Sequence, residues 1–238
     1  MQCATPKGGR TPPSSRQQGT ARRRQLQLLE PEVIRALAAR LRLVNLLERF
    51  PERPLWAAFV FVNGFITIGV LAGVAKLFKS PFIFPSLGPS AFLFFFTPTL
   101  PTASPRHTIY GHAIGIICGW TSLWLTGLNH AGPALVEGVN LQRILAAALS
   151  LASTGALMVL FRAAHPPAGA TTLIISLGII TRPIHLLFIE LAIGILTIQA
   201  IVINRLAGVN YPLWARKIDP GSGNVEFCDV TSETRRSG

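Results

Sequence analysis

The sequence carries little charge, and few of its charges are negative. Only 13% of the 238 residues are charged, and 22 Lys and Arg stand against 10 Asp and Glu. In soluble domains about a quarter of the residues are charged. Because 50% of this chain is hydrophobic and its mean hydropathy is +0.45, the composition indicates a protein that lies mostly within a bilayer.

The sequence also lacks the residue groups that catalysis and metal binding need. Its three cysteines, Cys3, Cys118 and Cys228, are too few and too far apart for a disulfide framework or a thiolate metal site. It shows neither a phosphate-binding loop nor a nucleophile with a neighbouring base. We therefore expect no catalytic residue, no metal and no cofactor, and an enzyme acting within the membrane is the less favoured class.

Long stretches without any charge dominate the middle of the chain. Such stretches separate Arg53 from Lys76, Lys79 from Arg106, Arg106 from Glu137, Arg143 from Arg162, Arg162 from Arg182 and Glu190 from Arg205. Several approach the roughly 20 apolar residues that cross a hydrocarbon core. The pattern predicts an all-α polytopic membrane protein with six hydrophobic segments, at 55–78, 81–101, 107–128, 141–161, 168–180 and 184–206.

Prolines interrupt the second and fifth segments. Five of them punctuate 81–101, so that only Ser90 to Phe96 is expected to be helical there. Before the fifth segment, Pro166 and Pro167 follow His165, and prolines are tolerated only in the first turn of a helix. We expect two short helices, each with free N–H groups at its start.

The six segments form two similar sets of three. An offset of 79 residues places 86–91 over 165–170, and the identical words Ala-Ile-Gly-Ile at 113–116 and 192–195 have the same offset. The sequence therefore predicts two three-segment repeats, with the second and fifth segments short or broken. If each repeat crosses the membrane three times, the second is inverted relative to the first.

Loop charges distinguish this arrangement from one in which the short segments re-enter. With six crossings, Arg106, Arg162 and Arg205 share the side of the N-terminus, and the turn at 129–140 lies opposite. With four crossings, Arg106 and Arg162 move to the outer side. Six crossings with the N-terminus inside fit the positive-inside rule better, although re-entrant segments stay open.

The two ends of the chain differ from its middle. We expect residues 1–30 to form a disordered basic tail, or alternatively an organelle transit segment, because 1–29 contain no acidic residue. Residues 31–53 have the apolar spacing of an amphipathic helix, lying on an anionic membrane surface or on the protein's own face. The transmembrane domain is expected at 54–206 and a polar tail at 207–238. Nucleic acid is not an expected partner, since no recognition fold is present.

The starts of the two short helices are the candidate binding site. Each would direct the positive end of a helix dipole, roughly half a unit charge, toward a cavity, and that end favours an anion. The candidate substrate-binding residues are Ser86, Gly88, Pro89, Ser90, His165, Pro166, Pro167, Ala168, Gly169, Ala170 and Thr171. Arg106 and Arg162 would attract anions, or alternatively anchor span ends in headgroups.

Other polar residues within the segments have more than one interpretation. His165 could cap a helix, or bind the anion or a co-transported proton, and metal ligation is least favoured because no second ligand lies at suitable spacing. Glu190 and His112 are candidates for proton coupling, since ionisable groups inside a span are costly. Gly111, Gly115 and Gly119 recur every four residues and are expected to form a face for close helix packing.

Four sequence motifs indicate a known family. They are SLGPSAFLFF at 86–95, PRHTIYGH at 105–112, HPPAGATTLI at 165–174 and NRLAGVNYP at 204–212. Together they resemble the HPP integral membrane family over roughly 55–214. The resemblance implies a polytopic membrane protein, and some members of that family transport nitrite across cyanobacterial and plastid membranes.

We therefore expect an integral membrane protein that transports a small inorganic anion. Nitrite is the leading candidate because of the resemblance, whereas the residues alone reach only a small anion. A membrane-embedded scaffold that recruits a partner is the alternative function. The expected location is a bacterial cell membrane of cyanobacterial type or a plastid envelope, with the N-terminus on the cytoplasmic or stromal side. The sequence leaves open whether the chain forms a homo-oligomer.

Overall fold

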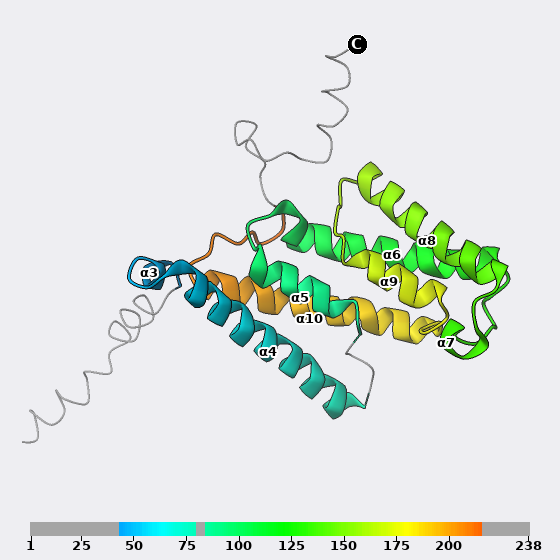
Figure 1. Cartoon of the computed structure of the whole chain (residues 1–238), viewed down its shortest axis with the longest axis horizontal. Coiled ribbons are helices and arrows are strands. Elements are labelled where there is room, and N and C mark those ends of the chain that lie inside the picture. Colours follow the sequence, from blue (N-terminus) through cyan, green and yellow to red (C-terminus); the bar gives the residue numbers. More distant parts are fainter. Residues whose placement is uncertain (1–42, 80–83, 216–238) are drawn as a thin grey trace, which may run out of the picture.

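The computed structural model describes residues 43–79 and 84–215, and all regular structure in these ranges is helical (Figure 1). The fold class is therefore all-α, as expected. The helices in chain order are α3 (Leu43–Leu47), α4 (Glu52–Phe78), α5 (Leu87–Phe96), the 3-10 turn η1 (Pro101–Ala103), α6 (Pro105–Leu125), α7 (Ala134–Glu137), α8 (Leu141–Leu160), α9 (Ala168–Ser176) and α10 (Pro183–Leu206).

Helix length separates possible spans from interrupted segments. Within the described ranges, α4, α8 and α10 are long and apolar enough to cross a membrane. Helices α5 and α9 have 10 and 9 residues, which at 1.5 Å per residue gives about 15 and 14 Å. That is about half of a hydrocarbon core of roughly 30 Å. The shortness expected of the second and fifth segments is thus observed.

Successive helices run in alternating directions. Figure 1 shows α4, α6 and α9 pointing away from the end at which α3 lies, and α5, α8 and α10 pointing back toward it. Backbone contacts agree, because the amide of Arg106 at the start of α6 donates to the carbonyl of Trp214, which follows α10 (2.9 Å). At the other end, the amide of Ala134 at the start of α7 donates to the carbonyl of Leu177, which follows α9 (2.9 Å).

Helix α6 packs closely against α9 through the expected glycine face. A Cβ added to Gly111 would lie 2.6 Å from the Cβ of His165, and at Gly115 and Gly119 it would lie 2.8 Å from the carbonyl oxygens of Ala168 and Thr172. Real Cβ atoms do not approach backbone so closely. The glycines therefore allow the two backbones to touch, which confirms the predicted role of this face.

Two boundaries of the short helices differ from those expected. Helix α5 begins at Leu87 rather than at Ser90, because Pro89 lies in its first turn, where the missing N–H costs no hydrogen bond. Helix α9 ends at Ser176 rather than at Ile180, since the chain turns at Gly178 with a φ of 77°. Both short helices are therefore set by local backbone chemistry.

The expected amphipathic helix at 31–53 lies partly outside the described residues, which begin at 43. Its described part is α3, which ends at Leu47, six residues earlier than expected. Pro51 follows a turn and precedes α4, which starts at Glu52. Proline disfavours a helix in the residues before it, so one helix cannot continue through this point. The tail at 1–30 and the part of the C-terminal tail from 216 onward lie outside the described ranges.

Candidate functional site

Four buried polar side chains meet where α5, α6 and α9 converge. Ser90 lies in the first turn of α5, His112 two turns into α6, His165 just before α9 and Thr171 within α9. Each is 0% exposed. All four were predicted as site residues, and we call them the histidine cluster.

Hydrogen bonds connect the histidine cluster into a chain. Ser90 Oγ lies 2.9 Å from His112 Nε2 and 3.1 Å from His165 Nε2. His112 Nδ1 lies 2.8 Å from Thr171 Oγ1. At the other end, His165 Nδ1 lies 2.8 Å from the carbonyl oxygen of Thr102. Both imidazoles thus have a partner at each ring nitrogen, and their ring centroids are 5.0 Å apart.

Two partners of His165 were missed from the sequence. Thr102 in η1 acts through its carbonyl oxygen, a group that every residue carries, so its type gives no signal. Thr108 Oγ1 lies 3.4 Å from His165 Nδ1 and donates to the carbonyl of Ser104. Thr108 precedes His112 by one helical turn and so shares its face, and helical periodicity could have identified it.

The expectation of free N–H groups at the start of α9 is wrong. The amides of Ala168, Gly169 and Ala170 donate to the carbonyls of His165, Pro166 and Pro167, at 3.0, 2.9 and 3.1 Å. These are i to i−3 bonds, which form because the two prolines adopt helical angles without donating N–H groups themselves. The donors available near this helix start are therefore side chains.

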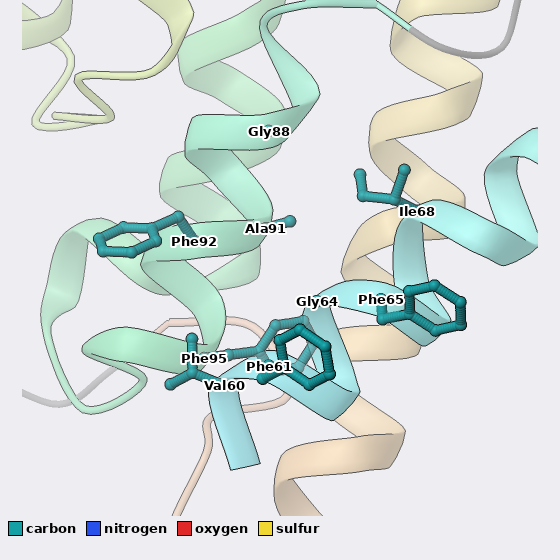
Figure 2. Close-up of a pocket in the computed structure, with 9 residues that line it drawn as sticks. All are labelled: Val60, Phe61, Gly64, Phe65, Ile68, Gly88, Ala91, Phe92 and Phe95. Atoms are coloured by element: carbon teal, nitrogen blue, oxygen red, sulfur yellow. The ribbon is translucent and has the colours of Figure 1, made fainter. Parts of the chain in front are cut away.

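Two predicted residues of α5 lie away from the histidine cluster. Gly88 and Pro89 are exposed, and Gly88 lines a groove of about 410 Å³ between α4 and α5 (Figure 2). The lining is apolar, with Val60, Phe61, Phe65 and Ile68 of α4 opposite Ala91, Phe92 and Phe95 of α5. The groove therefore has no donor suited to an anion.

Two buried hydroxyls of the short-helix segments lack a hydrogen-bond partner among the described residues. They are Ser86 Oγ, just before α5, and Thr172 Oγ1, next to Thr171 in α9. Both residues are 0% exposed. A buried hydroxyl without a partner is costly, so these groups favour any ligand that accepts a hydrogen bond.

Arg106 contacts the end of α8 rather than the cluster. Its guanidinium donates to the carbonyl oxygens of Arg162 at 2.9 Å and Phe161 at 3.2 Å. Arg205 donates to the carbonyl of Tyr211 at 3.1 Å. The first turn of α6 and the ends of α8 and α10 thus bring three arginines to one end of the molecule.

Arg143, which sequence analysis did not select, is the most deeply buried arginine of the described part. It is 2% exposed and donates to the carbonyl oxygens of Ser176 at 3.1 Å and Gly132 at 2.6 Å. Ser176 is the last residue of α9, so Arg143 places a positive charge at the negative end of this helix dipole. It therefore holds α9 from the end opposite to the cluster.

Glu190 lies on α10, outside the histidine cluster. Its Oε2 atom is buried and has no hydrogen-bond partner within the described ranges. No three His, Cys, Asp or Glu side chains in these ranges are grouped so as to hold a metal ion. The two imidazoles of the cluster are bridged by a hydroxyl instead, which suits proton exchange better than metal binding.

Tyr211, which follows α10, contacts both η1 and α5 near the histidine cluster. Its hydroxyl donates to the carbonyl of Ala103 in η1, and its ring makes an edge contact with Phe94 of α5. Burial raises the pKa of this phenol, so it stays a donor at all relevant pH values. Asn204 of α10 adds a bond from Nδ2 to the carbonyl of Phe94 at 3.1 Å.

Comparison with known proteins identifies the family of this chain. The model of a family described as "HPP, transmembrane region" matches residues 51–212, which contain α4 to α10 and the histidine cluster. A transmembrane protein of Dictyostelium discoideum is 31% identical over 134 residues, covering 54% of this chain and 44% of that protein, less than half of its length. No solved structure matches. The chain is therefore an integral membrane protein that belongs to the HPP transmembrane family.

Proposed function

We propose that this protein transports a small inorganic anion through the region where α5 and α9 begin. Nitrite is the leading candidate for this anion. The observation that carries the proposal is the meeting of two short helices at one buried polar cluster, with Ser90 Oγ 3.1 Å from His165 Nε2. The choice of nitrite rests on the resemblance to the HPP family. The proposal assigns no catalytic residue.

The interrupted helices support a transport role. Interrupted backbone at membrane depth is stable only where it faces protein or a polar cavity. Discontinuous helices that meet near the midplane form the substrate sites of many secondary transporters. Helices α5 and α9, each about half a bilayer long, run in opposite directions from the cluster and fit that pattern (Figure 1).

The helix boundaries also agree with an inverted repeat. The sequence offset of 79 moves the bounds of α6 to 184–204, against Pro183–Leu206 for α10. It moves those of α5 to 166–175, against Ala168–Ser176 for α9. Since the paired helices run in opposite directions, two halves of this kind would alternate access to a site between them.

Side-chain donors would bind the anion. Ser86 and Thr172 each offer a buried hydroxyl that has no partner within the described ranges, and the start of α9 adds its positive dipole end. Arg106, Arg162 and Arg205 at one end would raise the local anion concentration. The histidine cluster is hydrogen-bonded internally, so binding requires α5 to move away from α9 and open the Ser90–His165 contact.

Nitrite uptake by proteoliposomes tests the proposal. Purified full-length protein should give saturable uptake above that of empty vesicles. Thr172→Val, which replaces the hydroxyl by a methyl group, should reduce uptake by on the order of tenfold, the value of one hydrogen bond to an ion. The matched control is Thr197→Val, since Thr197 is also buried but bonds within α10 to the carbonyl of Ile193.

The result separates transport from the alternative function. Saturable uptake that Thr172→Val lowers and Thr197→Val leaves unchanged supports an anion path beside α9. Uptake equal to that of empty vesicles for folded wild-type protein overturns the proposal and favours a membrane-embedded scaffold.

A further inference from the structure

A single hydroxyl bridges the two imidazoles of the histidine cluster. Ser90 Oγ lies within hydrogen-bond distance of Nε2 of both His112 and His165, at 2.9 and 3.1 Å. A hydroxyl has one proton to donate. When both rings are neutral, Ser90 can therefore donate to one ring and accept from the other. The carbonyl oxygen of Ser86, the other acceptor near this hydroxyl, lies farther away at 3.4 Å.

Thr102 and Thr171, the partners at the two ends of this hydrogen-bond chain, determine which atoms in it donate and which accept. His165 Nδ1 faces the carbonyl oxygen of Thr102 at 2.8 Å, which can only accept, so Nδ1 carries the ring proton. His165 Nε2 then accepts from Ser90, and Ser90 accepts from Nε2–H of His112. The remaining His112 nitrogen, Nδ1, accepts from the hydroxyl of Thr171 at 2.8 Å. The two histidines thus have opposite tautomers.

We infer that Ser90 joins His112 and His165 into one proton-binding unit, and that the anion is transported together with a single proton. This inference rests on the proposed function. A proton from hydronium, which leaves water behind, can bind His112 Nδ1, and this nitrogen then donates to Thr171 after that hydroxyl turns. Transfer of one proton from His112 Nε2 to Ser90 Oγ, and of the Ser90 proton to His165 Nε2, moves the positive charge to His165. No heavy atom needs to move.

The geometry limits the unit to one added proton. The ring centroids of His112 and His165 are only 5.0 Å apart, and both rings are 0% exposed. Two imidazolium ions at this distance in a buried site repel each other strongly. One proton shared between two rings is the stable charged form.

The surrounding charges explain why the proton requires an anion. Helices α5 and α9 contribute no ionisable side chain to the cluster. Those of the neighbouring elements are Glu52, Arg53 and Lys76 of α4, Arg106, His107, Tyr110 and Cys118 of α6, Glu137 of α7, Arg143 of α8, Arg162 between α8 and α9, His185, Glu190 and Arg205 of α10, and Tyr211 after α10. None of the described carboxylates, Glu190 included, forms an ion pair with either ring. An imidazolium here would have no counter-charge until an anion binds, so each ligand increases the affinity for the other.

Coupled movement of charge is directly measurable. Proteoliposomes that contain a pH-sensitive dye should acidify internally as nitrite enters, one proton per nitrite, after subtraction of the signal of empty vesicles. Uptake should rise by on the order of tenfold with an inward proton gradient, within the usual range for two coupled ligands. A membrane potential set with potassium and valinomycin should not change the rate, because the pair carries no net charge.

Substitutions of the bridging residue locate the effect. Ser90→Ala removes the hydroxyl, and the remaining uptake should no longer respond to the proton gradient. Ser90→Thr restores the hydroxyl and should restore the response. Ser150→Ala is the matched control, since Ser150 is equally buried but bonds to Ser176 between α8 and α9, and it should respond like the wild type. Uptake that follows the potential without acidification overturns the inference and leaves nitrite transport in place.

The tautomers can be observed without any transport. In protein labelled with ¹⁵N-histidine, the ring-nitrogen chemical shifts should show His112 protonated at Nε2 and His165 at Nδ1, assigned with single His→Gln variants. The same tautomer in both rings overturns the inference even if nitrite is transported. Opposite tautomers without nitrite uptake by the wild type would support the hydrogen-bond chain through Ser90 but would contradict the proposed function.

Discussion

Helices α5 and α9 are both short, both start after a proline and both reach the histidine cluster, yet they are held very differently. The backbone of α9 touches the glycine face of α6, and Arg143 binds its last carbonyl. Helix α5 packs between α4 and α10 and borders an apolar groove on the α4 side. At Gly88 in α5 an added Cβ would meet nothing within 4 Å.

The difference also divides the residues of the histidine cluster between α5 on one side and α6 with α9 on the other. His112 and Thr171 belong to α6 and α9, which are locked together, and His165 directly precedes α9. Ser90 alone comes from α5. Any motion of α5 relative to α9 must therefore break or form the Ser90 hydrogen bonds, and the following substitutions test this contrast.

The largest effect is expected at the glycine face. Gly115→Ala places a Cβ 2.8 Å from the carbonyl oxygen of Ala168, a backbone atom that cannot yield without moving α9. We expect a loss of about 3 kcal/mol of stability, the upper range for overpacking. The buried thiol of Cys118 reports unfolding in micelles through its reaction with a thiol-specific dye, after Cys3 and Cys228 are replaced by Ser. Unchanged reactivity would contradict the close contact of α6 and α9.

A smaller loss is expected when α9 is released at its other end. Arg143→Met keeps much of the side-chain volume but leaves the carbonyls of Ser176 and Gly132 without their donor. Hydrogen bonds to a charged group contribute about 2 kcal/mol, and the Cys118 assay should show a loss of that order. Arg143→Lys should recover part of it, because one ammonium replaces one of the two bonds. Equal losses in both variants would argue against a role of the charge.

Removing the hydroxyl of Tyr211 should reduce stability less. Tyr211→Phe keeps the edge contact with Phe94 but loses the donor to the carbonyl of Ala103. The expected loss is about 1 kcal/mol in the same assay. Tyr211→Ala, which removes the ring as well, should cost clearly more. A phenylalanine variant as unstable as the alanine variant would show that the hydroxyl, not the ring, connects α5 to η1.

The smallest effect is expected at Gly88, a glycine of α5 that is not in close backbone contact. Gly88→Ala adds a Cβ into open space, and replacing a helical glycine by alanine stabilises a helix by about 0.5 kcal/mol. Stability should therefore be unchanged or slightly higher, and nitrite uptake should persist because Gly88 faces the apolar groove. A loss as large as that of Gly115→Ala would remove the difference between α5 and α9.

Much of this arrangement could be predicted from local chemistry. Proline positions located the two interruptions, and the spacing of Gly111, Gly115 and Gly119 identified the packing face. Polar residues beside the breaks included three members of the cluster, and His112 was selected as an ionisable residue inside a span. These inferences succeed because backbone restrictions and helical periodicity act within a few residues.

The remaining features depend on contacts between distant segments. The sequence could not show that His165, Pro166 and Pro167 would supply carbonyls to the amides of Ala168, Gly169 and Ala170, which are therefore not free. Arg143 resembled an ordinary charge at a span end, and its burial depends on a partner 33 residues further along the chain. Glu190 was placed with the proton-binding residues by its polarity alone, whereas α10 holds it apart from the cluster.

Helix α9 also has a consequence for the energy balance of the membrane. Its positive end faces the two imidazoles, while its negative end is neutralised by Arg143, so the field at the cluster repels an unaccompanied proton. Hydrogen-bonded histidines inside a membrane protein could otherwise conduct protons down their gradient. In the proposed transporter, the orientation of this one helix would oppose the entry of a proton alone and would allow it only together with an anion.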